Sequence, residues 1–168
     1  MALIALNIRP PRNEVTAVGN GLAGGHVIVD AGERMEWKNL TPASSRREFL
    51  VAFYDDSQGA RVPVWPVAGQ TTPAGSTCIG PTGMTWLRVP AAGVQFQLAA
   101  TSLPSFLKFD VHVAPIGGGS PCTPDTAFVS LDPMIIIKTR SSAVNVAFGV
   151  TCAVLGAFAG ALVTALLS

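Results

Sequence analysis

The sequence has little charge of either sign. Asp, Glu, Lys and Arg make up 12% of the 168 residues, against about 25% in an ordinary soluble domain. The 11 basic and 10 acidic residues leave a net charge of +1, so no overall field attracts phosphate backbones or acidic substrates. We therefore expect no nucleic-acid partner. The hydrophobic content of 49% excludes a disordered chain.

Histidine and cysteine are scarce as well, which limits catalysis and metal binding. His26 and His112 accompany no nucleophile motif such as Gly-x-Ser-x-Gly, and His112 alternates with apolar neighbours, so we expect it to face solvent. Cys78, Cys122 and Cys152 are too far apart to suggest paired zinc ligands or a disulfide framework. We predict free thiols, no enzyme activity, no cofactor and no identified small-molecule substrate.

Charge is absent from the C-terminal end of the chain. No residue from Ser141 to Ser168 is charged, and the run from Ala143 to Leu167 is apolar or small except at three polar positions. This run exceeds the roughly 20 residues that a helix needs to cross a bilayer. The pattern predicts one transmembrane helix over 141–168. A buried core helix of a soluble protein is the alternative.

Two basic residues indicate an orientation for this helix. Lys138 and Arg140 directly precede it, and the positive-inside bias then favours a cytoplasmic N-terminal domain. Met1–Arg9 lacks the basic region and the small-residue cleavage site of a secretory signal. We expect a tail-anchored, single-pass protein of the cell inner (cytoplasmic) membrane, with its C-terminus on the far side.

One face of the predicted helix carries small side chains. Small-xxx-small spacing lets a neighbouring helix approach closely in lipid, although Gly and Ala are also simply common in membrane spans. The expected helix–helix interface consists of Gly149, Cys152, Ala153, Gly156 and Gly160.

The N-terminal part, residues 1–114, has the pattern of a mainly β domain. Apolar residues recur with a period of two between Gly, Pro, Asn and Asp clusters, which is typical of a β-sandwich or barrel; we expect an antiparallel β-sandwich, for which the immunoglobulin fold is one model. The expected strands are Leu3–Ile8, Glu14–Val18, His26–Val29, Arg34–Lys38, Glu48–Tyr54, Thr85–Val89, Val94–Leu98 and Leu107–Val113. The expected core aromatics are Trp37, Phe49, Phe53, Phe96 and Phe109.

The residues between this domain and the helix, 115–140, form a Pro/Gly-rich linker followed by an apolar juxtamembrane segment. Thr126–Ile137 is too apolar to remain in water, so it adds an edge strand, lies on the membrane or packs along a partner subunit. Long loops at Leu40–Arg47 and Pro63–Gly83 are further candidate contact surfaces. The candidate partner contacts are Phe128, Ile135, Ile136, Ile137, Arg46 and Arg47.

The stretch from His26 to Asn39, with its strand, Ala-Gly-Glu turn and Trp-Lys-Asn strand, resembles the opening of a cupredoxin domain. The resemblance continues weakly through Glu48–Asp55 and Phe109–Val113 and implies a β-sandwich fold. It does not carry the copper ligands. The family's first histidine falls in Leu40–Arg47, which contains none, and Cys78–Met84 has no histidine between its Cys and its Met.

These features together predict a non-catalytic accessory subunit. We expect a single-pass, membrane-anchored protein that stabilises a larger membrane complex, for example a photosynthetic or respiratory energy-transducing one. Its partners are then integral membrane protein subunits and the lipid bilayer. The alternatives are a tail-anchored binding module that recruits a soluble partner through its loops and, less favoured, a copper electron carrier.

Overall fold

The computed structural model describes residues 1–10, 12–19, 22–23, 27–69, 74–100, 103–104, 106–119, 121–127, 131 and 133–138. The chain divides into two compact units, Met1–Lys138 and Thr139–Ser168. The second unit, and with it the predicted transmembrane helix at 141–168, lies outside the described residues. Among the residues that are described, no helix has the length and hydropathy needed to span a bilayer.

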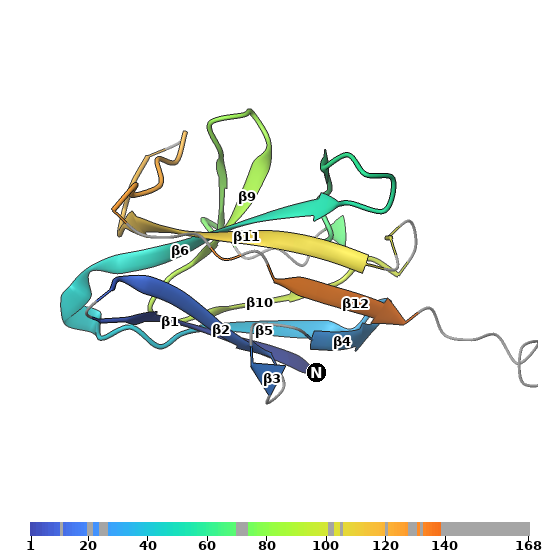
Figure 1. The fold of residues 1–168 in the computed structure, drawn as a ribbon, viewed down its shortest axis with the longest axis horizontal. Coiled ribbons are helices and arrows are strands. Elements are labelled where there is room, and N and C mark those ends of the chain that lie inside the picture. Colours follow the sequence, from blue (N-terminus) through green and yellow to red (C-terminus); the bar gives the residue numbers. More distant parts are fainter. Residues whose placement is uncertain are drawn as a thin grey trace, which may run out of the picture. The chain divides into compact units, whose positions relative to one another are not determined.

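The described part of the first unit is a mainly β structure of two sheets (Figure 1). The smaller sheet, in spatial order, contains β10 (Val94–Gln97), β5 (Arg34–Asn39), β1 (Ala2–Arg9), β2 (Glu14–Gly19) and β3 (Leu22–Ala23). The larger sheet contains β4 (Val27–Asp30), β12 (Met134–Lys138), β11 (Phe106–Pro115), β6 (Arg47–Asp55), β9 (Thr85–Val89) and β8 (Thr77–Ile79), with β7 (Val62–Pro63) paired to β6. A 3-10 turn, η1 (Ala43–Ser45), lies between β5 and β6.

Two strand pairs depart from the antiparallel arrangement that the sequence predicts. β1 runs parallel to β5, and β12 runs parallel to β4. Parallel neighbours need a crossover connection. Between β1 and β5, and again between β4 and β12, the chain contributes at least one strand to the other sheet before it returns. The sandwich is therefore mixed, with the remaining pairs antiparallel.

The core lies between the sheets and is built by strict alternation. On β11, Leu107, Phe109, Val111 and Val113 are all fully buried. The aromatic centre is Trp37, whose ring meets Phe109 edge-on at 5.0 Å, a geometry that aromatic quadrupoles favour. All five aromatics predicted for the core are buried, with Phe96 the most exposed of them at 2%.

The sandwich extends beyond the boundary expected from the sequence. β12 lies between β4 and β11 (Figure 1, orange) and pairs with both. Ile135 and Ile137 point into the core, because alternation along β12 sends every second side chain inward. The compact unit that contains the sandwich thus extends to Lys138, and β12 is an interior strand and not an edge strand.

Candidate functional site

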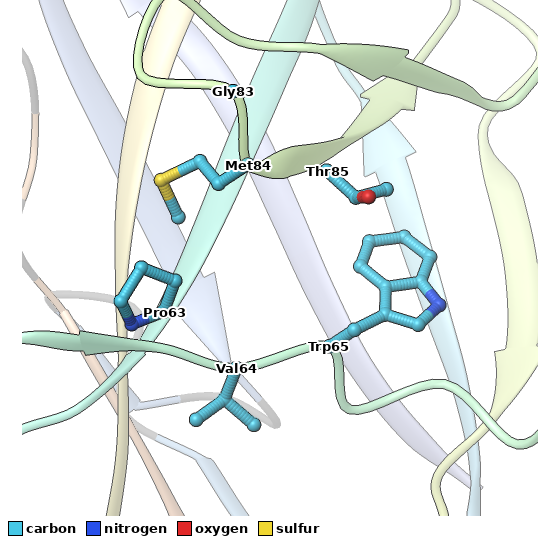
Figure 2. A pocket seen from close by; sticks show the side chains of 6 residues that line it. All are labelled: Pro63, Val64, Trp65, Gly83, Met84 and Thr85. Carbon is cyan, nitrogen blue, oxygen red and sulfur yellow. The ribbon is translucent and has the colours of Figure 1, made fainter.

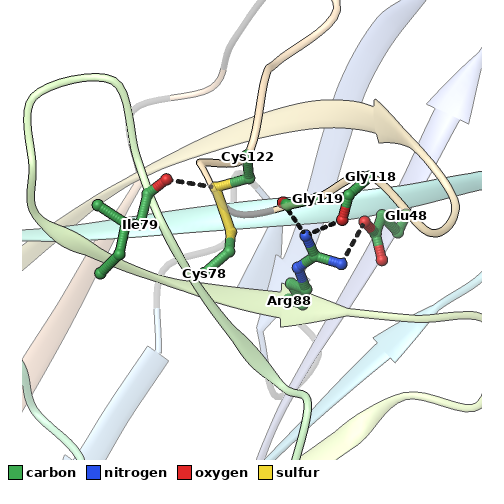
Figure 3. The surroundings of a disulfide bond; sticks show 7 residues. All are labelled: Glu48, Cys78, Ile79, Arg88, Gly118, Gly119 and Cys122. Carbon is green, nitrogen blue, oxygen red and sulfur yellow. Dashed lines mark hydrogen bonds and ion pairs between the residues drawn. A yellow bond between two sulfur atoms is a disulfide. The ribbon is translucent and has the colours of Figure 1, made fainter.

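The segment after β11 is fastened across the outer face of the larger sheet. We call residues 116–119 and 121–127 the strap. Cys122 of the strap forms a disulfide with Cys78 of β8, with 5.8 Å between the Cα atoms (Figure 3). The Cys122 amide donates to the Ile79 carbonyl at 2.8 Å. The prediction of free thiols at these two positions is wrong. Spacing along the chain could not reveal the pairing, because the two cysteines are 44 residues apart and only the folding of the strap over the sheet brings them together.

A partly buried arginine, Arg88, also holds the strap. The Arg88 guanidinium donates to the carbonyls of Gly118 and Gly119, the second at 2.7 Å, and Nη1 lies 3.4 Å from Glu48 Oε1 (Figure 3). Burial raises the pKa of Glu48, and the Arg88 charge opposes that rise. A desolvated ion pair of this kind is costly to break from one side, so Arg88 fixes the strap to β9 and β6.

The strap covers a second, smaller hydrophobic cluster on the outer face. Its buried members are Leu50, Ala52, Cys78, Trp86, Ala114 and Cys122. His112 stacks on the indole of Trp86, with ring centroids 5.0 Å apart and 8° between the planes. Burial lowers the pKa of His112; the charge of Asp110 opposes this shift and that of Arg61 adds to it. His112 is therefore half-buried against Trp86. The sequence pattern had predicted that it faces solvent.

The two long loops singled out in the sequence each line a depression. A groove of about 490 Å³, which we call the Leu40 groove, lies at one end of the sandwich. It is lined by Asn7, Ile8, Pro10, Asn13, Leu40, Thr41, Pro42, Ser45 and Arg47. Leu40 is 55% exposed, so the groove presents an apolar side chain to solvent.

A smaller depression of about 250 Å³ lies beside the Pro63–Gly83 region. Pro63, Val64 and Trp65 form one wall, and Gly83, Met84 and Thr85 form the other (Figure 2). Both depressions are open, and neither gathers titratable groups for catalysis.

The two arginines predicted as partner contacts have different surroundings. Arg46 is exposed and closes η1 with a left-handed backbone, φ 50°. Arg47 forms an ion pair with Asp125 of the strap, which lowers the pKa of Asp125 together with a hydrogen bond from the Ala127 amide, the larger cause. Arg46 thus remains at the surface, whereas Arg47 helps to hold the strap.

The isoleucines predicted as partner contacts divide by alternation. Ile135 is fully buried and Ile137 is 4% exposed, so both side chains contribute to the core of the folded domain. Ile136 is partly exposed on the opposite face of β12. The single-sequence pattern missed this division because three consecutive isoleucines show no period of two.

Of the remaining predicted site residues, the structure describes one, Lys138. Phe128, Arg140 and the helix–helix positions Gly149, Cys152, Ala153, Gly156 and Gly160 lie outside the described residues. Lys138 is the last residue of β12.

The residues present do not fit a blue copper site. Such a site needs two imidazole nitrogens and a thiolate, yet the sulfurs of Cys78 and Cys122 are joined in a disulfide. The loop after Asn39 supplies no imidazole. Within the residues that the structure describes, no three His, Cys, Asp or Glu side chains gather where they would hold a metal ion.

Comparison with known proteins gives a likeness of fold. No family model matches the chain, and no curated protein matches it. Among solved structures, the chain is similar to the McoA multicopper oxidase from the hyperthermophile Aquifex aeolicus, with 13% sequence identity and a TM-score of 0.32. The match covers 82% of this chain and 26% of that enzyme. At this TM-score the likeness carries no argument about the family or the activity of this chain.

Proposed function

We propose that this chain is a non-catalytic, single-pass membrane-anchored accessory subunit, which stabilises a larger membrane protein complex. The observation that carries the proposal is the junction at Lys138. A disulfide-fastened β-sandwich ends there, and the uncharged sequence from Ser141 to Ser168 begins three residues later. That sequence has the length and hydropathy of a membrane span.

The fold supports a structural role for the domain. The strap is held by the disulfide, by Arg88 and by the Arg47–Asp125 ion pair. These contacts join the strap to β8, β9 and β6 on the outer face of the larger sheet. A domain fastened in this way keeps its shape when it is bound on several sides, which suits a subunit that braces its neighbours.

Two observations disagree about which side of the membrane the domain occupies. Lys138 and Arg140 favour the cytoplasmic side, whereas the Cys78–Cys122 disulfide favours an oxidising compartment, since stable disulfides are rare in the cytosol. We give the disulfide more weight, because two basic residues are a small bias and large domains translocate largely regardless of charge. We propose that the domain faces the non-cytosolic side.

The anchoring helix is expected to bind neighbouring helices through its small residues. Replacing both Gly156 and Gly160 by leucine would fill the groove that a partner helix enters. The control places leucine at Ala147 and Ala165, which lie about 180° around the helix from Gly156 at 3.6 residues per turn. We expect the leucine variant at Gly156 and Gly160 to lose copurification with membrane subunits in mild detergent. The leucine variant at Ala147 and Ala165 should retain it.

The same purification tests the accessory-subunit proposal as a whole. Mass spectrometry of the wild-type preparation should find polytopic subunits at a constant ratio to this chain. Recovery of the chain by itself, or equal behaviour of the two variant pairs, would contradict the proposal.

A second candidate function is a membrane-anchored binding module, and the Leu40 groove favours it. The groove has a volume of about 490 Å³, in the range of small-molecule sites, and Leu40 supplies an exposed apolar contact. A loosely held soluble partner that is lost when Leu40 is replaced by glutamate would support this function over the first.

A further inference from the structure

Three apolar side chains form a row on the outer face of the larger sheet. In the strand register, Ile136 of β12 stands opposite Ile28 of β4 on one side and opposite Phe106 of β11 on the other. Cross-strand partners point to the same face of a sheet. Their chain neighbours Val27, Ile135 and Leu107 are fully buried in the core, so the three side chains of the row point outward.

The row is accessible in the folded domain. Phe106 is 51% exposed and Ile28 is 43% exposed, while Ile136 between them is partly exposed. Figure 1 shows the three strands side by side, with β4 at the border of the sheet. The strap covers the outer face over β6, β8 and β9. It contacts β11 near Val113, at the end of that strand opposite to Phe106.

The row lies close along the chain to the apolar segment. β12 ends at Lys138, two residues after Ile136, and the apolar run begins at Ala143. Only four residues, 139–142, separate β12 from the apolar run in the sequence. If the run crosses a bilayer, as we propose above, the row is held near the membrane surface.

The size and composition of the row fit lipid better than a protein surface. A specific protein interface buries about 800 Å² on each partner, far more than three side chains provide. An interfacial lipid contact needs only a few aromatic and aliphatic side chains beside basic residues, and aromatic rings favour the interface. Lys138 and Arg140 lie between the row and the apolar run in the sequence, and long basic side chains near the end of a membrane span reach toward the lipid headgroups.

The geometry points to a membrane contact: the row Ile28–Ile136–Phe106 inserts into the interface of the bilayer that holds the apolar segment. This inference rests on the proposed anchoring. It adds that one particular face of the domain contacts lipid. The outer face of the smaller sheet then points away from the membrane, and its exposed Val18 stays in water.

Spin labelling in vesicles tests the contact. In a Cys152→Ser background, the full chain carries a nitroxide at Phe106→Cys or, as the control, at Val18→Cys, a residue with 44% exposure on β2. The chains are reconstituted in vesicles of phosphatidylcholine and phosphatidylglycerol. We expect the ratio of oxygen access to nickel-chelate access to be several-fold higher at position 106 than at position 18, because oxygen concentrates in lipid. Ile28→Cys provides a second site in the row.

The outcomes separate the inference from the anchoring on which it rests. Equal nickel-chelate access at positions 106 and 18, in chains that resist alkaline carbonate extraction, would overturn the inference and leave the anchoring intact. Low access of both reagents at position 106 would indicate contact with a second protein chain and would also overturn it. Extraction of the chain by carbonate would overturn the anchoring and the inference together.

Discussion

Breaking the Cys78–Cys122 disulfide should destabilise the sandwich by a predictable amount. The two cysteines are 44 residues apart in sequence, and closing a loop of that length in the unfolded chain removes entropy worth about 4 kcal/mol at 25 °C. Noncovalent contacts of the strap, including the Arg88 bonds to Gly118 and Gly119, persist without the disulfide. We therefore expect Cys78→Ala and Cys122→Ala to fold, with native far-UV circular dichroism and reduced stability.

Urea titration of the full chain in detergent, followed by tryptophan fluorescence, measures this loss. With a slope of about 2 kcal/mol per molar urea, the unfolding midpoint should fall by about 2 M. The two single variants, the double variant and the reduced wild type should lose similar amounts, because each lacks the same cross-link. Cys152→Ala serves as the matched control and should leave the midpoint unchanged, since Cys152 lies outside the sandwich unit.

Two outcomes would refute this reasoning. A loss below about 1 kcal/mol would mean that the unfolded chain gains little freedom when the cross-link is absent. A double variant much less stable than either single variant would mean that the two side chains act separately, through packing, and not through their bond.

Two further predictions concern the domain. Because burial lowers the pKa of His112 from its ordinary value of 6.5, the unfolded chain binds its proton more readily than the folded chain does. The stability contributed by neutral His112 is thus present above pH 6.5 and is lost as the pH falls through its lowered pKa. The free energy of unfolding should drop more between pH 7.5 and pH 5.5 in the wild type than in His112→Gln; equal drops would exclude this role. Gly93 and Gly59 both have left-handed backbones, φ 75° and 74°, but a Cβ at Gly93 would lie 2.6 Å from the Trp37 carbonyl oxygen, while one at Gly59 meets nothing within 4 Å. Gly59→Ala should cost about 1–2 kcal/mol and Gly93→Ala about 1–3 kcal/mol more, and equal unfolding midpoints would contradict the clash.

The strands that could be predicted are those whose side chains alternate. Val94–Leu98 was expected as a strand and β10 covers Val94–Gln97; Thr85–Val89 was expected and is β9. In β9 the outer face carries Trp86, which the strap covers. In β10 one face meets the core and the other meets water, so the local pattern carries the information. The same holds for Trp37 and Phe109, whose burial follows from their positions on the apolar faces.

What could not be predicted depends on partners distant in sequence. Met134–Lys138 contains an unbroken apolar run, and only its position between β4 and β11 decides that Ile135 turns inward and Ile136 outward. The pairing of Cys78 with Cys122 likewise follows from the placement of the strap over the sheet. Neither relation leaves a trace in local composition, which is why the pairing of β12 was not predicted and the cysteine chemistry was predicted wrongly.

The interior position of β12 also orders events during synthesis. β4 and β11 leave the ribosome before β12 does. Until residue 138 has emerged, the strand that pairs with both of them is missing from the sheet. Val27 and Leu107, which the finished fold buries, are then exposed. The apolar segment at 141–168 is translated within seconds of that point. Closure of the sandwich and delivery of the segment to the membrane therefore overlap in time, and a delay in either leaves the nascent chain with an unpaired strand edge open to aggregation.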